Sequence, residues 1–147
     1  MLIGINPNMP PDLLDCLMRM GHGDEIVIAD ANFPSTSTAM DTVVGEVIHL
    51  PAFTAPDAVS LITEMMPLDA YSDACAYRME IDGEPEALDD VHVETFAIID
   101  AAKPEAAMVS SIERQEFYAR AARSFAVVNT NESRPFGCFI LRKGVIF

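Results

Sequence analysis

The sequence has few basic residues and no long apolar run. Nine Lys and Arg stand against 23 Asp and Glu among 147 residues, which gives a formal net charge of −14. Because so acidic a chain repels phosphate groups, we expect neither nucleic acid nor an anionic membrane surface as a partner. No apolar run approaches the roughly 20 residues that a membrane-spanning helix needs. The N-terminus lacks the basic flank and apolar core of a signal peptide, so we expect a cytoplasmic protein.

Cysteine and histidine are also scarce. The three cysteines are odd in number and widely spaced: Cys16, Cys75 and Cys138. This spacing favours neither a disulfide framework nor a zinc knuckle. No paired-histidine motif is present, so we expect no metal site and no cofactor. We interpret His49 as a structural residue within a strand and place His92 on the surface of a helix.

Helical and strand patterns alternate along the whole chain. Apolar spacing predicts helices at 11–20, 54–66, 88–102 and 113–121, and strands at 25–29, 43–50, 77–81, 106–110, 124–130 and 139–145. The strand at 77–81 alternates apolar and polar residues, as a half-exposed strand does, and 32–38 has the Ser, Thr, Asn and Pro of a loop. The alternation predicts one layered α/β/α domain over residues 1–147, with a mixed or mostly parallel sheet.

One stretch, 20–34, combines a turn, a buried strand and a polar loop. Gly21 sits where a helix needs a left-handed residue to stop, and 25–29 is apolar like a buried strand. Asp30 follows at the carboxyl end of that strand, where ligands of open α/β sheets bind. Since a strand rises about 3.3 Å per residue, His22 and Asp30 cannot share a pocket on one straight chain. Either the glycine turn folds His22 back or a neighbouring subunit completes the site.

The order of residues in this stretch resembles the signature of the L-fucose mutarotase family, whose relatives include D-ribose pyranase. The matching residues are Met20, Gly21, His22, Gly23, Asp24, Glu25, Ile26, Asp30, Phe33 and Pro34. A pattern Arg-x-x-Phe-Tyr-x-Arg-Ala from Arg114 and the closing Ile-Leu-Arg-Lys-Gly-Val at 140–145 are similar to the family as well. The resemblance implies a mutarotase-like α/β fold, a small monosaccharide as the partner, and a homo-oligomer between a dimer and a decamer.

The resemblance also implies an activity and a set of site residues. The activity is interconversion of the α and β anomers of L-fucose or a related sugar by acid–base opening and closure of the ring. His22 corresponds to the proton donor, and an unperturbed imidazole pKa of about 6.5 suits that role. Asp30 would accept hydrogen bonds from sugar hydroxyls or orient the histidine, and Arg114 matches an arginine that contacts the substrate. Second-tier candidates are Asp69, Tyr71 and Tyr118.

The run Phe136-Gly137-Cys138 departs from the family, which usually has Tyr-Gly-Asn there. Phe136 keeps the ring without its hydroxyl, and Cys138 is a weak hydrogen-bond partner where the family has an amide. The departure leaves open a substrate other than fucose. It also leaves open three alternatives: a pyranose/furanose isomerase like ribose pyranase, a non-catalytic sugar-binding or assembly protein, and an enzyme in which Cys138 and His22 form a thiol–imidazole pair.

Overall fold

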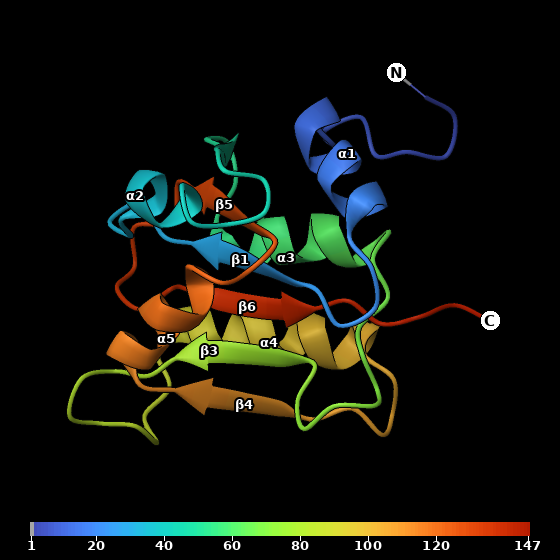
Figure 1. Ribbon diagram of the computed structural model, residues 1–147. Coiled ribbons are helices and arrows are strands. Elements are labelled where there is room, and N and C mark those ends of the chain that lie inside the picture. Colours follow the sequence, from blue (N-terminus) through green and yellow to red (C-terminus); the bar gives the residue numbers. More distant parts are fainter. Residues whose placement is uncertain (1) are drawn as a thin grey trace.

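The computed structural model describes residues 2–147, and a six-stranded sheet forms its middle layer (Figure 1). The strands are β1 (Glu25–Ala29), β2 (Val47–Leu50), β3 (Ala76–Met79), β4 (Val109–Ile112), β5 (Ala126–Thr130) and β6 (Phe139–Arg142). Their order is β2-β5-β1-β6-β3-β4. Strand β6 runs antiparallel to β1 and β3, whereas the other pairs are parallel. The predicted α/β class and the mixed sheet are confirmed.

Helices cover both faces of the sheet. One face carries α1 (Pro11–Arg19), α3 (Ala55–Thr63) and α4 (Asp90–Ala102), and the other carries α2 (Ser35–Ala39) and α5 (Arg114–Ala121). Successive side chains of a strand point to opposite faces, so β1 serves both cores: Ile26 and Ile28 pack with α1, α3 and α4, and Val27 packs with α5. The apolar run at 25–29 is therefore buried on both sides.

Local sequence signals explain where helices begin. Thr54 and Asp57 form a capping box at the start of α3, in which each side chain bonds the other's backbone N–H. The Glu113 carboxylate accepts hydrogen bonds from the first-turn amides of Gln115 and Glu116 and so caps α5. The Glu113 cap sets where α5 starts, and therefore where Arg114 lies.

Several predicted boundaries and exposures are wrong. The predicted loop at 32–38 contains the short helix α2, and the strand predicted at 106–110 lies at Val109–Ile112. Strand β3 is buried on both faces, and Arg78 within it donates hydrogen bonds to the carbonyl oxygens of Met79 and Pro85. The left-handed residue after α1 is Gly23, with φ +86°, and not Gly21. His92 is fully buried instead of lying on the surface.

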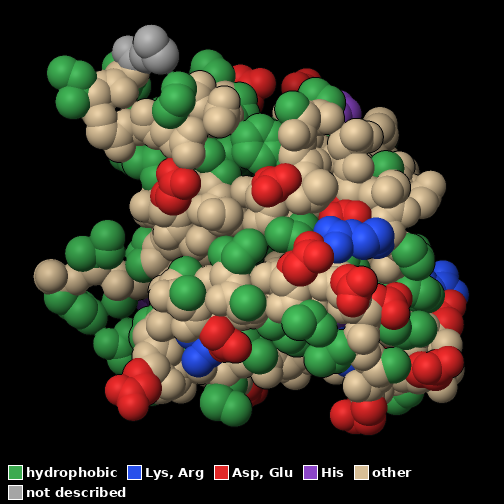
Figure 2. All heavy atoms as spheres, turned by 180° about the vertical axis from the view of Figure 1, so that it is seen from behind, with side chains coloured by type: hydrophobic (Ala, Val, Ile, Leu, Met, Phe, Trp, Pro, Cys, Tyr) green, Lys and Arg blue, Asp and Glu red, His purple; other side chains and the backbone are tan. Residues whose placement is uncertain are grey.

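The surface reflects the acidic composition. Seen from behind, acidic side chains clearly outnumber basic ones, with hydrophobic side chains between them (Figure 2). Within residues 2–147, no helix is both long enough and apolar enough to cross a bilayer.

Candidate functional site

A small cavity lies at the carboxyl end of β1, on the face that α5 covers. Its volume is about 160 Å³, and we call it the Asp30 pocket; it is lined by Asp30, Asn32, Phe33, Met79, Arg114, Tyr118, Pro135, Phe136 and Cys138. Drug-sized ligands occupy about 300–1,000 Å³, so this pocket fits a smaller molecule. Five predicted site residues thus converge here from three separate stretches of the chain: Asp30, Arg114, Tyr118, Phe136 and Cys138.

Asp30 is held rigidly at the bottom of this pocket. Asp30 is only 6 % exposed. Its Oδ1 accepts hydrogen bonds from the amides of Asn32 and Phe33, both at 2.9 Å. This local turn occupies one carboxylate oxygen. Oδ2 is then the oxygen available to accept a hydrogen bond from a ligand hydroxyl.

Arg114 and Tyr118 form the α5 wall. The Arg114 guanidinium pairs with Asp82 through Nε at 2.9 and 3.0 Å and through Nη2 at 2.9 Å. The hydrogen bonds that the guanidinium donates to the Asp82 and Tyr118 side chains raise the pKa of Arg114 above its usual range. The guanidinium also lies 5.9 Å from the centre of the Tyr118 ring. Arg114 is thus a fixed cation in the lining of the Asp30 pocket, although its Nε and Nη2 groups already bind Asp82.

The loop before β6 forms the opposite wall. Phe136 has φ +58°, a conformation that side chains rarely adopt. Gly137 lies where a Cβ would approach the Cγ of Glu132 to 2.8 Å, so only glycine fits. Cys138 is 1 % exposed, and its sulfur accepts a hydrogen bond from the amide of Asp30. Burial raises the pKa of the Cys138 thiol well above its ordinary value, which leaves the thiol protonated and a poor nucleophile.

His22 lies in a second group of side chains at the other end of β1. We call this group, with Asp69 and Tyr71, the His22 cluster. The Nε2 of His22 is 3.1 Å from Oδ1 of Asp69, and its ring meets the Tyr71 ring edge-on with centroids 6.0 Å apart. The imidazole stays 48 % exposed, whereas the Asp69 carboxylate is 1 % exposed. The cluster therefore presents a histidine to solvent and buries its partner.

Asp69 stays ionised although it is buried. Burial raises its pKa, but hydrogen bonds from the Ser72 side chain, the Tyr71 amide and His22 lower it to about 2. Arg142 adds a cation 3.5 Å from Oδ2. An ionised carboxylate can only accept hydrogen bonds, so we assign the proton of neutral His22 to Nε2. Nδ1 of His22 then carries the free lone pair and can take up or give a proton.

The two groups do not meet within one chain. His22 and Asp30 are eight positions apart in the sequence, a span of about 26 Å along a strand. The amide of Asp69 donates to the carbonyl of Arg142, the last residue of β6. The amide of Asp30 donates to the sulfur of Cys138, just before the first residue of β6. The two groups therefore lie at opposite ends of that strand. The glycine turn does not fold His22 back toward Asp30. Two expectations are therefore wrong within one chain: Asp30 orienting His22, and His22 pairing with Cys138.

Sequence reasoning missed several residues that the fold brings in. Asn32, Phe33, Met79 and Pro135 line the Asp30 pocket, and Arg142 supports Asp69. Asn32 and Phe33 lie two and three positions after Asp30, which was a usable signal, whereas Met79 and Arg142 end strands without any distinguishing motif. Among the described residues 2–147, no three His, Cys, Asp or Glu side chains are grouped so that they could hold a metal ion.

Known proteins resemble this chain over its full length. Human fucose mutarotase is 39% identical over 148 residues, which cover 99% of this chain and 94% of that protein. The crystal structure of the Streptococcus pneumoniae fucose mutarotase in complex with L-fucose superposes with a TM-score of 0.88 at 34% identity, covering 99% of this chain and 100% of that one. Bacillus subtilis RbsD complexed with D-ribose shares the fold, with a TM-score of 0.74 at 21% identity over the whole of both chains. The sequence model of the RbsD / FucU transport protein family matches residues 3–146, and this chain therefore belongs to that family.

Proposed function

We propose that this protein is a sugar mutarotase that interconverts the α and β anomers of L-fucose or a closely related monosaccharide. Full-length similarity to fucose mutarotases of 34% identity and above supports the reaction. The Asp30 pocket supports a ligand of monosaccharide size, with a carboxylate, an arginine and aromatic rings around it. Sugar hydroxyls can hydrogen-bond to the carboxylate and the arginine, and the C–H groups of a sugar can pack against the faces of the aromatic rings.

His22 is the acid–base group in this proposal. Neutral Nδ1 takes the proton of the anomeric hydroxyl, the bond between the anomeric carbon and the ring oxygen breaks, and the ring oxygen receives the proton from the imidazolium. The reverse steps close the ring on the other face of the carbonyl carbon, so atoms and charge balance. The ionised Asp69, 3.1 Å from Nε2, stabilises the imidazolium between the two transfers.

A second copy of the chain supplies His22 to the pocket. One observation supports this step: the exposed His22 and the Asp30 pocket lie at opposite ends of β1. The His22 side chain is 48 % exposed on a tight turn, so it is accessible to the Asp30 pocket of another copy. A closed homo-oligomer that joins these surfaces repeats the contact at every subunit.

Mixing two inactive variants tests the shared site. His22→Gln removes the proton-transfer group and Asp30→Asn weakens the sugar contact, each in a different half. We expect a co-expressed one-to-one mixture to regain about one quarter of wild-type activity, because each site draws its two halves independently from two kinds of subunit. A mixture no more active than its separate components, or a wild type that light scattering finds monomeric, would refute the shared site.

The identity of the sugar is tested separately. Saturation-transfer NMR measures anomer exchange directly for L-fucose, ribose, galactose and rhamnose. We expect enhanced exchange for L-fucose or another sugar that needs few hydrogen bonds from Phe136 and Cys138. Enhancement of pyranose–furanose exchange of ribose alone would favour the pyranase alternative, and enhancement of no sugar would favour a binding protein. The cytoplasmic location stays a prediction.

A further inference from the structure

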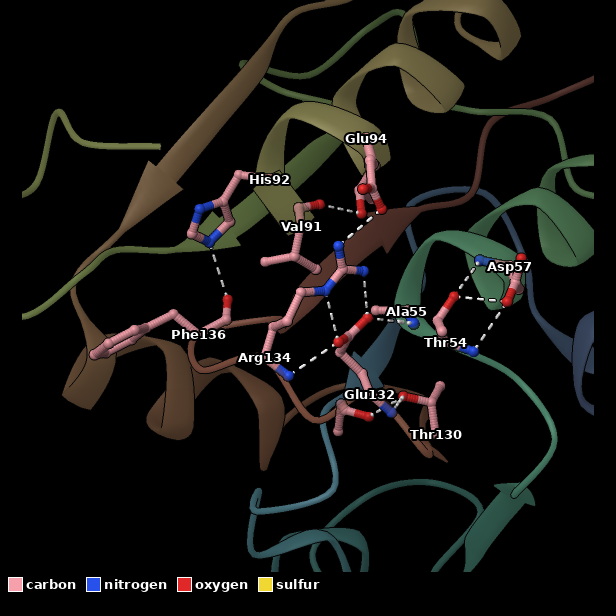
Figure 3. A network of polar contacts seen from close by, with 12 residues as sticks. Thr54, Ala55, Asp57, Val91, His92, Glu94, Thr130, Glu132, Arg134 and Phe136 are labelled. Atoms are coloured by element: carbon pink, nitrogen blue, oxygen red, sulfur yellow. Dashed lines mark hydrogen bonds and ion pairs between the residues drawn. The ribbon is translucent and has the colours of Figure 1, made fainter. Parts of the chain in front are cut away.

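His92 lies outside the Asp30 pocket but contacts its wall. It sits in the first turn of α4, on the face of the sheet opposite α5, and is fully buried against Phe139 with ring centroids 6.0 Å apart. Figure 3 shows its ring directed at the loop that precedes β6. There Nε2 is 3.0 Å from the carbonyl oxygen of Phe136. A residue of the far helix layer thus reaches a residue that lines the pocket.

Both ring nitrogens of His92 have a partner. Nδ1 accepts a hydrogen bond from the amide of Asp89 at 3.0 Å. Since Nδ1 is the acceptor, the neutral ring carries its proton on Nε2 and donates it to the Phe136 carbonyl. Burial lowers the pKa of His92, the bond to Phe136 opposes that shift, and the charges of Arg78 and Asp89 lower and raise the pKa respectively. The ring is therefore neutral near pH 7 and its two bonds have fixed directions.

The backbone at Phe136 needs such support. A positive φ on a large side chain is unfavourable by itself and persists only where the surroundings impose it. Gly137 has no room for a side chain, since a Cβ would also approach the carbonyl oxygen of Arg134 to 3.1 Å. The hydrogen bond from His92 is the contact that fixes the Phe136 carbonyl itself.

The rest of the loop is tied to the same helix layer. Arg134 bridges Glu132, at 2.8 and 2.9 Å, and Glu94 of α4, at 2.9 Å (Figure 3). Glu132 also accepts a hydrogen bond from the amide of Ala55 at the start of α3. Because these contacts anchor the preceding residues of the loop, the position of the Phe136 carbonyl depends on its hydrogen bond with His92.

We propose that His92 is a positioning residue that holds the Phe136 ring in place as a wall of the Asp30 pocket and thereby sets the affinity for sugar. The inference rests on the proposed function for its sugar readout. It predicts that the two ring nitrogens have separable tasks: Nδ1 supports the start of α4, and Nε2 holds the pocket wall.

Two variants separate these tasks. His92→Asn keeps an acceptor near the Nδ1 position but is too short to reach Phe136, whereas His92→Gln places an amide N–H near the Nε2 position and loses the acceptor. We expect His92→Asn to raise the KM for L-fucose about 2- to 10-fold, the effect of one hydrogen bond, with kcat changed less. We expect His92→Gln to retain the wild-type KM despite a lower Tm.

Hydrogen exchange of the segment 131–138, followed by mass spectrometry, gives a readout that needs no activity. His92→Asn should speed exchange in this segment, and His92→Gln should not. Equal exchange and equal KM in both variants would overturn the inference and leave His92 as an ordinary core residue. If the wild type accelerates no anomer exchange, the proposed function fails. The difference in hydrogen exchange between the variants then decides alone whether His92 holds Phe136.

Discussion

The His22 cluster and the Asp30 pocket lie at opposite ends of β1 and differ in exposure and shape. The His22 imidazole is 48 % exposed on a glycine turn, whereas Asp30 is 6 % exposed at the bottom of a hollow. A group that transfers protons must reach a substrate held elsewhere, and a group that binds hydroxyls must be shielded from competing water. In the proposed function, the exposed His22 transfers the proton and the concave Asp30 pocket binds the sugar.

The two regions share one device, a buried carboxylate held by an arginine. Asp69 stands beside Arg142 in the His22 cluster, and Glu132 pairs with Arg134 behind the pocket wall. The pKa of each carboxyl is about 2. Because both stay ionised over the physiological range, each fixes its neighbours by charge: Asp69 orients His22, and Glu132 anchors the loop that ends at Phe136.

The largest effect is expected for His22→Gln. A glutamine retains hydrogen bonding but cannot cycle a proton near neutrality, so anomer exchange of L-fucose measured by saturation-transfer NMR should fall about 10²- to 10⁴-fold. His49→Gln is the matched control, since His49 is exposed on β2 away from both regions, and it should remain active. Full activity in His22→Gln would refute the role of His22 in proton transfer and assign both binding and proton transfer to the Asp30 pocket.

A smaller loss is expected for Asp69→Asn. The amide cannot stabilise an imidazolium, so exchange should fall about 10- to 100-fold, the range of a hydrogen bond to a charged group. The ¹⁵N resonances of the His22 ring should show a changed tautomer balance. Asp73→Asn, at a neighbouring exposed position, should change neither signal. If Asp69→Asn alters thermal stability but not the His22 resonances, Asp69 is only structural.

The smallest effect on activity is expected for Glu132→Gln, which bears on acid stability instead. The hydrogen bonds from Arg134 lower the pKa of Glu132 from 4.5 to about 2 although burial opposes them. A lowered folded-state pKa stabilises the fold above about pH 4.5, and this contribution is lost as the pH falls toward 2. The Tm of the wild type should therefore fall across that window, and the Tm of Glu132→Gln should fall less steeply.

Glu105→Gln serves as the control for the acid experiment, because Glu105 is exposed. Its Tm should follow the wild-type slope. A parallel decline in Glu132→Gln and the wild type would mean that the loop behind the pocket is not held by this carboxylate.

Much of the site's membership was readable in the sequence. The position of Asp30 after an apolar run and the family resemblance around Arg114 and Phe136 named residues that do converge in one pocket. Their roles there stay predictions. The apolar spacing likewise predicted most helices, because this signal acts between residues a few positions apart.

Contacts across long sequence separations were decided by the tertiary structure alone. Asp69 reaches His22 over 47 positions because β6 inserts between β1 and β3 and brings Arg142 beside Asp69. His92 was predicted on the surface of its helix, yet it is fully buried and donates a hydrogen bond to the carbonyl oxygen of Phe136, 44 positions along the chain.

The sequence by itself determined the class of fold, the caps and the chemical types available at each end of β1. Only the tertiary structure decided that the His22 cluster and the Asp30 pocket lie apart, at opposite ends of β1. The reason is physical: hydrophobic period and capping depend on neighbours along the chain, whereas strand order and register depend on how the whole core packs.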